Sequence, residues 1–289
     1  MKRSSFPAFV IAASLGLPAF AADAPKPLRV LLLAGGCCHD YKAQKDILKK
    51  GIEVRANARV EVIYTEDYEI GKGDKPDATK PKFPIYGNPD YAKGFDVVLH
   101  DECSASITDP AIIAGVLKPH LDGIPGVNLH CAMHCYRFGE FKTPVAPGAD
   151  NAHWYEYLGL QSTGHGPQEP IAITFTAKDS PIVKGFADWT TIKEELYNNI
   201  QILTGKELAK GRQTAKGKDG TTKETETVVA WTNEYGPKKT RVFSTTIGHN
   251  HVTVEDARYL DLVTRGVLWS AGKLNDDGTP AKGYGPGGK

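Results

Sequence analysis

Three short apolar runs in the first half of the chain each stop abruptly at histidine, cysteine or carboxylate residues. The runs are Leu28–Ala34, Phe95–Leu99 and Val127–Leu129, and the polar segments that follow them are Gly35–Asp40, His100–Cys103 and His130–Cys135. Apolar runs of this length with polar boundaries are typical of buried parallel strands. Ligands bind beyond the carboxyl ends of such strands in open sheets. The pattern therefore predicts a functional site at these three ends.

Helices and strands alternate through this half of the chain. A helix is predicted over about 42–58, a strand at Val60–Tyr64, and a surface insertion without a core of its own over about 72–89. Asp109-Pro110 starts another helix, because an N-cap residue is followed by proline in the first turn. The repeated units predict an α/β, flavodoxin-like, doubly wound and mainly parallel sheet with helices on both faces. Its strand order, 2-1-3-4, brings the three polar ends into one crevice.

The second half of the chain is less regular. Strands are expected at Ile171–Thr176, Val228–Thr232 and Val242–Ile247, and the last two form a β-hairpin. The segment 205–226 is nearly all Lys, Gly, Thr and Glu, which predicts a solvated loop. A closing helix is expected over about 255–273 with Thr253 as its N-cap, followed by a disordered tail at 275–289. Residues 22–274 are interpreted as a single domain.

Residues 1–21 have the pattern of a secretory signal. Lys2 and Arg3 supply a positive start, Phe9–Leu17 a short apolar core, and Ala19–Ala21 a small-residue cleavage site. The apolar core is too short to span a bilayer, and no later segment is apolar enough to do so. We therefore expect an exported protein, periplasmic or secreted, with no membrane span after cleavage.

Charge and glycine content narrow the range of partners. The net charge of the 289 residues is +1, and acidic and basic residues are interspersed. The sequence has no basic stripe with interleaved aromatic residues, so no nucleic-acid partner is expected. Gly35-Gly36 is too short to match a phosphate-binding glycine motif, so no nucleotide cofactor is expected.

The histidines suggest a metal site. His130 and His134 are four residues apart, so a helix that starts at the strand end places both on one face, where two imidazoles can share a metal. His251 follows His249 by two residues, and in an extended chain both point the same way. A cation held by histidine and carboxylate in an open site is the usual catalytic zinc arrangement. The predicted cofactor is a divalent cation, with zinc as the first choice, and its predicted ligands are His39, His100, His130, His134 and His251. Alternatively, each histidine is a satisfied polar group that caps a strand end or a helix.

Five cysteines leave at least one thiol unpaired unless it joins another chain. A disulfide between the neighbours Cys37 and Cys38 would be strained, and a chain of this length needs no disulfide scaffold. Structural disulfides are therefore not expected. A sharp elbow after the fourth strand needs small residues two before and two after its tip. These residues are small around His130 but bulky around Cys131, so histidine is favoured at the elbow and the cysteines are interpreted as bystanders.

Two further candidates lie in the second half. Glu195 follows Glu194 in a polar stretch and could act as an acid, a base or a metal ligand. The alternative interpretation of this stretch is a solvated helix start. His165 lies among Gly and Pro residues in an expected loop, where a histidine can be functional.

A set of short motifs follows in order along the chain: Gly35-Gly36 with His39-Asp40, Leu129–Ala132, Gly164-His165, Glu195–Tyr197, Trp231-Thr232, Gly248-His249 and Arg265–Trp269. Over about residues 28–273 the chain resembles the ThuA-like family, named for trehalose utilisation. The resemblance implies a flavodoxin-like fold similar to class I glutamine amidotransferases. It also implies a role in sugar catabolism, including disaccharides oxidised to keto-sugars. The chain carries His130 where amidotransferases have cysteine and His251 where they have glutamate, so glutamine amidotransferase activity is not expected.

The leading hypothesis is an exported enzyme that acts on a sugar or keto-sugar glycoside, a hydrolase or lyase with a divalent cation as Lewis acid. Its catalytic candidates are His130, His249, Glu195 and Asp101. Its candidates for binding a small-molecule carbohydrate are His39, Asp40, His165, Tyr197 and Trp154.

Two alternatives of other classes stay open. The first is a non-catalytic carbohydrate-binding or accessory protein, in which Trp154, Tyr155 and Tyr157 would stack on sugar rings. The second is thiol chemistry at three of the cysteines, Cys37, Cys38 and Cys131.

Overall fold

The computed structural model describes residues 25–217 and 220–289. The predicted signal at residues 1–21 lies outside the described residues. The strands are β1 (Leu28–Gly36), β2 (Ala58–Thr65), β3 (Tyr68–Ile70), β4 (Pro76–Pro81), β5 (Val97–Cys103), β6 (Gly126–Leu129), β7 (Leu160–Phe175), β8 (Trp189–Ile202), β9 (Lys206–Lys216), β10 (Thr222–Tyr235) and β11 (Thr240–Thr245). The α-helices are α1 (Tyr41–Arg55), α2 (Pro110–Leu121), α3 (His153–Leu158), α4 (His251–Glu255) and α5 (Ala257–Ser270). The 3-10 helices are η1 (His130–His134), η2 (Asp150–Ala152) and η3 (Pro286–Gly288).

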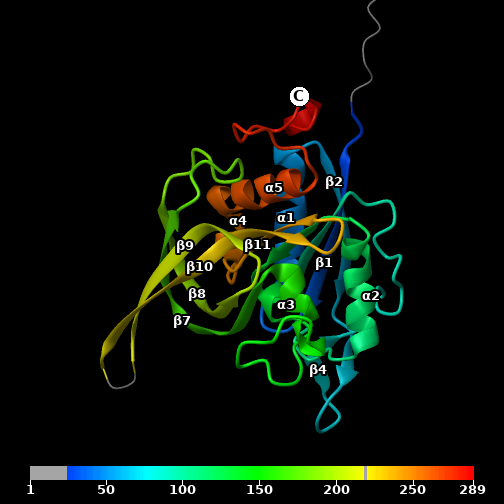
Figure 1. Ribbon diagram of the computed structural model, residues 1–289, viewed down its shortest axis with the longest axis vertical. Coiled ribbons are helices and arrows are strands. Elements are labelled where there is room, and N and C mark those ends of the chain that lie inside the picture. The colour runs from blue at the N-terminus through cyan, green and yellow to red at the C-terminus, as the bar shows by residue number, and fades with distance from the viewer. Residues whose placement is uncertain (1–24, 218–219) are drawn as a thin grey trace, which may run out of the picture.

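The strands form a nine-stranded sheet in the order β2-β1-β5-β6-β11-β10-β9-β7-β8, and β3 and β4 form a separate pair (Figure 1). From β2 to β11 all neighbouring strands are parallel. The first four have the predicted order 2-1-3-4, so the flavodoxin-like fold is confirmed. Successive side chains of β1 point to opposite faces. Val30 and Leu32 pack in the layer with α1 and α5, whereas Leu31 and Leu33 pack in the layer with α2 and α3.

The other half of the sheet is antiparallel. β10 and β11 form the predicted hairpin, and β9, β7 and β8 continue the sheet. The prediction of a loop at 205–226 is wrong, because β9 and the start of β10 form a long ribbon that projects from the body of the molecule (Figure 1). Cross-strand ion pairs hold this ribbon, at 3.4 Å between Lys210 and Glu226 and 3.9 Å between Arg212 and Glu224. A polar composition therefore does not exclude strands, and in β9 the apolar residues Leu208 and Ala209 are buried in the core.

The predicted insertion at 72–89 does contribute to the core. It contains β4, and the side chains of Phe83 and Ile85 are buried in the layer that also holds α2 and α3. Two apolar residues within a segment rich in Lys, Pro and Gly are enough to anchor it.

The C-terminal region differs from its prediction in two ways. The closing helix is divided into α4 and α5, and the N-cap of α5 is Asp256, whose carboxylate accepts a first-turn backbone N–H, and not Thr253. The tail at 275–289 follows a defined path instead of being disordered. The carbonyl of Tyr284 accepts a hydrogen bond of 3.0 Å from the backbone N–H of Asn57, next to the start of β2.

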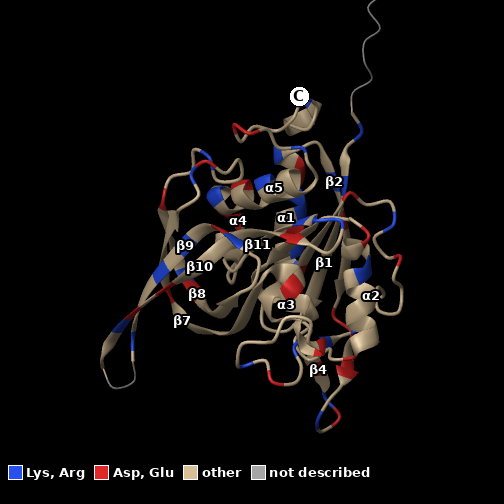
Figure 2. Cartoon of the chain, viewed as in Figure 1, with Lys and Arg blue, Asp and Glu red and all other residues tan. Residues whose placement is uncertain are grey.

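Acidic and basic residues are scattered over helices, strands and loops (Figure 2). The absence of a nucleic-acid partner stays a prediction. Across residues 25–217 and 220–289, no helix has the length and apolar character needed to cross a membrane.

Candidate functional site

Four side chains from distant parts of the sequence meet at the carboxyl ends of the parallel strands. They are His39 after β1, His130 at the start of η1, Glu195 on β8 and His249 before α4, and we call them the open cluster. One ligand atom from each lies within 4.8 Å of the others. The ring of His39 is 4.5 Å from that of His130 and 4.8 Å from that of His249, measured between centroids.

The backbone adopts unusual conformations at two places in this site, at Gly36 before His39 and at His130 itself. Gly36 has a φ of +99°, and a Cβ atom there would lie 2.2 Å from the carbonyl oxygen of Cys103, so only glycine fits. This close approach lets the chain turn from β1 toward His39. His130 itself has a φ of 41°, in the left-handed region that costs energy for a residue with a Cβ atom. Such strain clusters at functional sites, and here it forms the predicted elbow at the end of β6.

Glu195 contacts three histidines at once. Its Oε2 lies 3.4 Å from His130 Nε2 and 3.6 Å from His165 Nε2, and its Oε1 lies 3.2 Å from His249 Nδ1. The carboxylate is largely buried, with 7% of its side chain exposed. It therefore forms the negative centre of a group of imidazoles.

Three ring nitrogens of the open cluster are buried and lack an aligned hydrogen-bond partner among the described residues. They are His39 Nδ1, His130 Nε2 and His249 Nδ1. His130 Nδ1 donates a hydrogen bond of 2.6 Å to the backbone carbonyl of Thr246, which leaves a lone pair on Nε2. An outer hydrogen bond of this kind is what orients metal-binding histidines. Unpartnered buried nitrogens need an explanation such as a bound ion.

Burial and mutual charge set the protonation of these groups. Burial, followed by the nearby His130 and His249, lowers the pKa of His39 to about 2, so its ring is neutral. Burial alone would raise the pKa of Glu195, but the interactions with His130 and His249 outweigh it and hold this pKa below its usual range. Glu195 in turn raises the pKa of His249, against the effect of burial.

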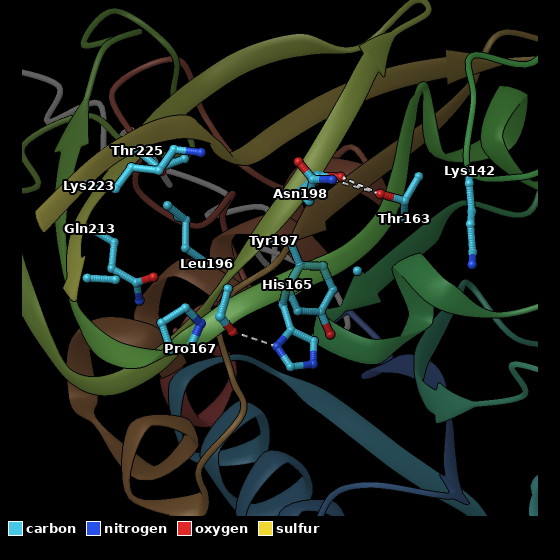
Figure 3. A pocket seen from close by; sticks show the side chains of 13 residues that line it. Lys142, Thr163, His165, Pro167, Leu196, Tyr197, Asn198, Gln213, Lys223 and Thr225 are labelled. Atoms are coloured by element: carbon cyan, nitrogen blue, oxygen red, sulfur yellow. Dashed lines mark hydrogen bonds between the residues drawn. The ribbon is translucent and has the colours of Figure 1, made fainter. Parts of the chain in front are cut away.

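One cavity reaches this group and a second, larger one adjoins the first. The first, of about 300 Å³, is lined by His39, Glu195 and Tyr197 together with four cysteines. The other, of about 640 Å³, shares His165 and Tyr197 with it. In Figure 3 the side chains of His165 and Tyr197, which line the larger cavity, lie between that of Gln213 on one side and that of Lys142 on the other. The open cluster therefore lies beside a polar cavity large enough for a small molecule.

Residues 93–270 match the ThuA family, which is described as trehalose utilisation. This segment is more than half of the chain and carries His130, Glu195 and His249. The chain belongs to the ThuA family. A search of curated proteins gives no match for this ThuA chain.

Solved structures of ThuA-like proteins resemble this ThuA chain. One from Parabacteroides merdae has a TM-score of 0.59 and 20% identity, and the alignment covers 86% of this chain and 92% of that chain. One from Bacteroides uniformis has a TM-score of 0.56 and 14% identity, with coverages of 90% and 97%. A glutamine amidotransferase from Thermotoga maritima aligns with a TM-score of 0.37 and 9% identity, with coverages of 85% and 96%. The strand order and the two ThuA-like structures agree on a flavodoxin-like α/β fold.

The ThuA chain brings only part of the predicted metal set together, namely His39 and His130. His134 instead lies 2.9 Å from Ser162 Oγ through its Nε2, and its ring stacks on Tyr197 at 4.2 Å. Burial holds the pKa of His134 well below its usual value. The reason for the separation is that η1 is a 3-10 helix with three residues per turn, so residues four apart do not share a face.

Two other predicted ligands of the ThuA chain also lie outside the open cluster. His251 is exposed and is the first residue of α4, so the chain turns there and His251 does not continue an extended segment from His249. His100 lies inside β5, which continues to Cys103 instead of ending at Leu99. The polar residues after Leu99 are therefore buried between layers.

His100 belongs to a second group, which we call the closed network: His100, Glu102 and His120. His100 Nδ1 lies 2.8 Å from Glu102 Oε1, and His100 Nε2 lies 3.1 Å from His120 Nε2. His120 Nδ1 donates a hydrogen bond of 2.7 Å to the carbonyl of Ile124. Burial, followed by the nearby His100, lowers the pKa of His120 to about 3. All four ring nitrogens are partnered, as expected of satisfied core histidines.

Asp101 is buried in the ThuA chain and is not part of the open cluster. It alternates along β5 with His100 and Glu102, so it points to the opposite face of the sheet. Burial, and then the charge of Glu102, raise the pKa of Asp101 well above its usual value. Its Oδ2 has no hydrogen-bond partner among the described residues. Asp101 is thus placed as a neutral carboxyl group beneath the site.

The substrate-binding candidates of the ThuA chain divide into two sets. His165 and Tyr197 line both cavities, and Asp40 is the N-cap of α1 at the edge of the site. Trp154 is different, because it is 2% exposed and its Nε1 donates a hydrogen bond of 2.8 Å to the carbonyl of Ala132. Its ring is part of the core and cannot stack on a sugar.

The cysteines of the ThuA chain are not bystanders. Disulfides join Cys37 to Cys38 and Cys103 to Cys131, contrary to the expectation of no structural disulfide. A vicinal disulfide forms here because the backbone at Cys38 adopts a φ of 86°. The second disulfide joins neighbouring strand ends, which the fold brings close together. Cys135 is outside both disulfides.

Sequence reasoning missed the residues of the ThuA chain that hold the open cluster in place. The carboxylate of Glu194 accepts backbone hydrogen bonds of 2.9 Å from His249 and 3.2 Å from Asn250. Gln44 Nε2 donates to the carbonyl of His249 at 3.2 Å, and Gln168 Nε2 lies 2.8 Å from His249 Nε2. The polar pair at 194–195 was the only available signal, since Gln44 and Gln168 belong to no motif.

Proposed function

We propose that this ThuA-family chain is a divalent-metal-assisted enzyme that acts on a carbohydrate, a sugar or a keto-sugar glycoside. The observation that carries the proposal is the set of three buried ring nitrogens that lack an aligned hydrogen bond and surround one carboxylate, whose oxygens lie 3.4 Å and 3.2 Å from two of them. The family supports the carbohydrate part, because its description is trehalose utilisation. The zinc preference rests on the donor set of three imidazoles and a carboxylate.

The distances within the open cluster support this assignment. Tetrahedral zinc with ligands at about 2.0 Å separates its ligand atoms by about 3.3 Å. His130 Nε2 and His249 Nδ1 lie 3.4 Å and 3.2 Å from the oxygens of Glu195. The neutral ring of His39 and the proton on His130 Nδ1 leave lone pairs directed into the cluster. A bound divalent cation there would supply Lewis-acid polarisation of a substrate oxygen.

The chain's own acid–base group beside the cluster is His165. Its Nδ1 donates a hydrogen bond of 2.8 Å to the carbonyl of Gly166, so Nε2 carries the lone pair. Nε2 faces Glu195 at 3.6 Å, and 43% of the side chain is exposed. His165 can therefore take a proton from a substrate hydroxyl in the cavity and hold it at Nε2, with the Glu195 carboxylate stabilising the imidazolium.

The larger cavity supports a polar substrate. Amide, hydroxyl and ammonium groups line it, including Asn198, Gln213 and Lys142 (Figure 3). Such groups fix the hydroxyls of a sugar by hydrogen bonds. The non-catalytic alternative loses its aromatic platform, since Trp154, Tyr155 and Tyr157 are each at most 2% exposed.

We also propose that the protein acts outside the cytoplasm. The pattern at residues 1–21 supports export, and two disulfides support an oxidising compartment. A fusion of residues 1–21 to a reporter protein tests the export signal. We expect the reporter to be found outside the cytoplasm with this segment and inside the cytoplasm without it.

Elemental analysis of protein purified without chelators tests the metal. We expect about one equivalent of a divalent metal in the wild type and less than about a tenth in His130→Ala. The control is His134→Gln, which lies on the same 3-10 helix but outside the open cluster and keeps the wild-type metal content. Absence of metal in the wild type, together with no gain on incubation with zinc, would overturn the proposal.

A further inference from the structure

Four sulfur atoms form a second chemical group at the edge of the site. Cys37 and Cys38 are joined by one disulfide, and Cys103 and Cys131 by another. The two disulfides are in contact, because Cys37 Sγ lies 3.5 Å from Cys103 Sγ. All four residues line the cavity of about 300 Å³ beside His39. The proposed metal chemistry uses none of these sulfurs.

The four sulfurs differ in their access to solvent. Cys38 is exposed and Cys37 is half-buried, whereas Cys103 and Cys131 are 2% and 6% exposed. An external thiol therefore reaches Cys38 more readily than the inner disulfide. Cys37 stands between the two. The fifth cysteine, Cys135, is buried, and its Sγ accepts a hydrogen bond of 3.0 Å from the backbone N–H of Ser104.

We propose that these cysteines form a thiol–disulfide relay, in which an external dithiol reduces the vicinal disulfide and the electrons pass to the inner one. One dithiol sulfur attacks Cys38, breaks the bond to Cys37 and leaves Cys37 as a thiolate. The second dithiol sulfur attacks the mixed disulfide, releasing the Cys38 thiol and the cyclic oxidised dithiol. Exchange of this kind depends on access and on which sulfur is attacked.

The inner transfer follows from the contact between the disulfides. The Cys37 thiolate attacks Cys103, forms a Cys37–Cys103 bond and expels Cys131 as a thiolate, which takes a proton. Cys38 then attacks Cys37, restores the vicinal disulfide and releases Cys103 as a thiol. In sum, one dithiol loses two electrons and two protons, and the Cys103–Cys131 disulfide gains them.

The relay has a consequence for the site, although it does not rest on the proposed metal. The inner disulfide ties the end of β5 to η1, and Cys131 follows His130 directly. Reduction removes this link beside the elbow. The substrate class of the relay is a small or protein-borne dithiol.

Disulfide mapping of Cys38→Ser in the full chain tests the relay. This variant leaves Cys37 unpaired at 3.5 Å from Cys103. We expect peptides linked through Cys37–Cys103, with Cys131 free to react with an alkylating reagent. The matched control, Cys37→Ser, leaves an unpaired Cys38, and only Cys103–Cys131 should be found. Recovery of Cys103–Cys131 alone in both variants would overturn the proposal.

A kinetic measurement keeps the test independent of how the single variants fold. Dithiothreitol is the dithiol, and the reduction of Cys103–Cys131 is followed by quenched alkylation and mass spectrometry. In the Cys37→Ser/Cys38→Ser variant we expect this reduction to be at least about tenfold slower than in the wild type, because the route through the vicinal disulfide is lost and only slow direct attack on the inner disulfide remains. Equal rates would show that the inner disulfide is reduced directly and would contradict the relay.

Discussion

The open cluster and the closed network both consist of histidines and a glutamate, but they differ in the hydrogen bonding of their ring nitrogens. In the closed network every ring nitrogen of His100 and His120 has a partner at 2.7–3.1 Å. In the open cluster three histidines each keep one buried nitrogen without an aligned partner. The closed network is sealed between the sheet and a helical layer, whereas His39, Glu195 and His249 of the open cluster line cavities.

This difference separates a structural role from a chemical one. The hydrogen-bonded imidazoles of the closed network stabilise one packed arrangement, although the Oε2 atom of Glu102 has no hydrogen-bond partner among the described residues. Buried groups left unpartnered are costly and need a further ligand to offset that cost. The open cluster therefore carries the proposed function, and the closed network holds β5 and α2 together.

Breaking the closed network has the largest expected effect on stability. His100→Ala leaves Glu102 Oε1 and His120 Nε2 without their partner and creates a cavity. We expect a loss of about 3–5 kcal/mol in the free energy of unfolding, measured by urea denaturation. The control is His165→Ala, where 43% of the side chain is exposed, with an expected change within about 0.5 kcal/mol. A loss below about 1 kcal/mol in His100→Ala would show that the network is not structural.

Breaking the open cluster should remove metal and leave the fold intact. Glu195→Gln removes the carboxylate that contacts three histidines. Outer-sphere substitutions cost about 10–100-fold in metal affinity, so loss of this ligand should cost more than about 100-fold. Competition with a chromophoric zinc chelator measures the affinity. The matched control is His134→Gln, with a change within about threefold. An unaltered zinc affinity in Glu195→Gln contradicts the assignment of Glu195 as a ligand.

Asp101, which belongs to neither the open cluster nor the closed network, makes the stability of the protein depend on pH. Its folded-state pKa is raised well above 3.8, first by burial and then by Glu102, so it stays protonated while the unfolded chain ionises. The free energy of unfolding should therefore fall as pH rises above 3.8, by up to about 1.4 kcal/mol per pH unit until the folded-state pKa is reached. Asp101→Asn removes this slope. The free energies of unfolding of the wild type and of Asp101→Asn are measured by urea denaturation from about pH 4 to 7. The same pH dependence in both proteins would contradict the raised pKa of Asp101.

The smallest effect concerns the pH dependence of metal binding. Glu195 raises the pKa of His249 above 6.5, so His249 must lose its proton before it can bind a cation. Zinc affinity should fall by up to about tenfold per pH unit as the pH drops below that raised pKa. The neutral His39, with a pKa of about 2, adds nothing to this dependence. Dissociation constants measured from about pH 8.5 to 5.5 provide the test, and a flat profile would remove His249 from the ligand set.

The sequence predicted the parallel half of the fold well. Short apolar runs and helix signals such as Asp109-Pro110 identified β1, β2, β5 and β6 in the right order. The ribbon of β9 and β10 was missed, because its segment is mostly polar and its buried positions, such as Gly211 and Gln213, give no apolar alternation. The antiparallel pairing of β9 with β10, which no local pattern shows, identifies both segments as strands.

The candidate site was predicted in part. Polar residues after strands pointed to His39 and His130, and the family motifs pointed to Glu195 and His249, and the structure brings these four side chains together. Spacing alone failed for His134, because the helix after β6 is a 3-10 helix, and for His100, because β5 continues through it. Whether a histidine is satisfied depends on partners from other elements, such as His120, which no local pattern shows.

Anomalous X-ray diffraction from zinc-loaded crystals tests the central claim most directly. The data locate zinc without reference to activity or substrate. We expect one strong anomalous peak bounded by His39, His130, His249 and Glu195, and none at His100 and His120. Zinc at the closed network, or no peak within the open cluster at saturating zinc, would contradict it.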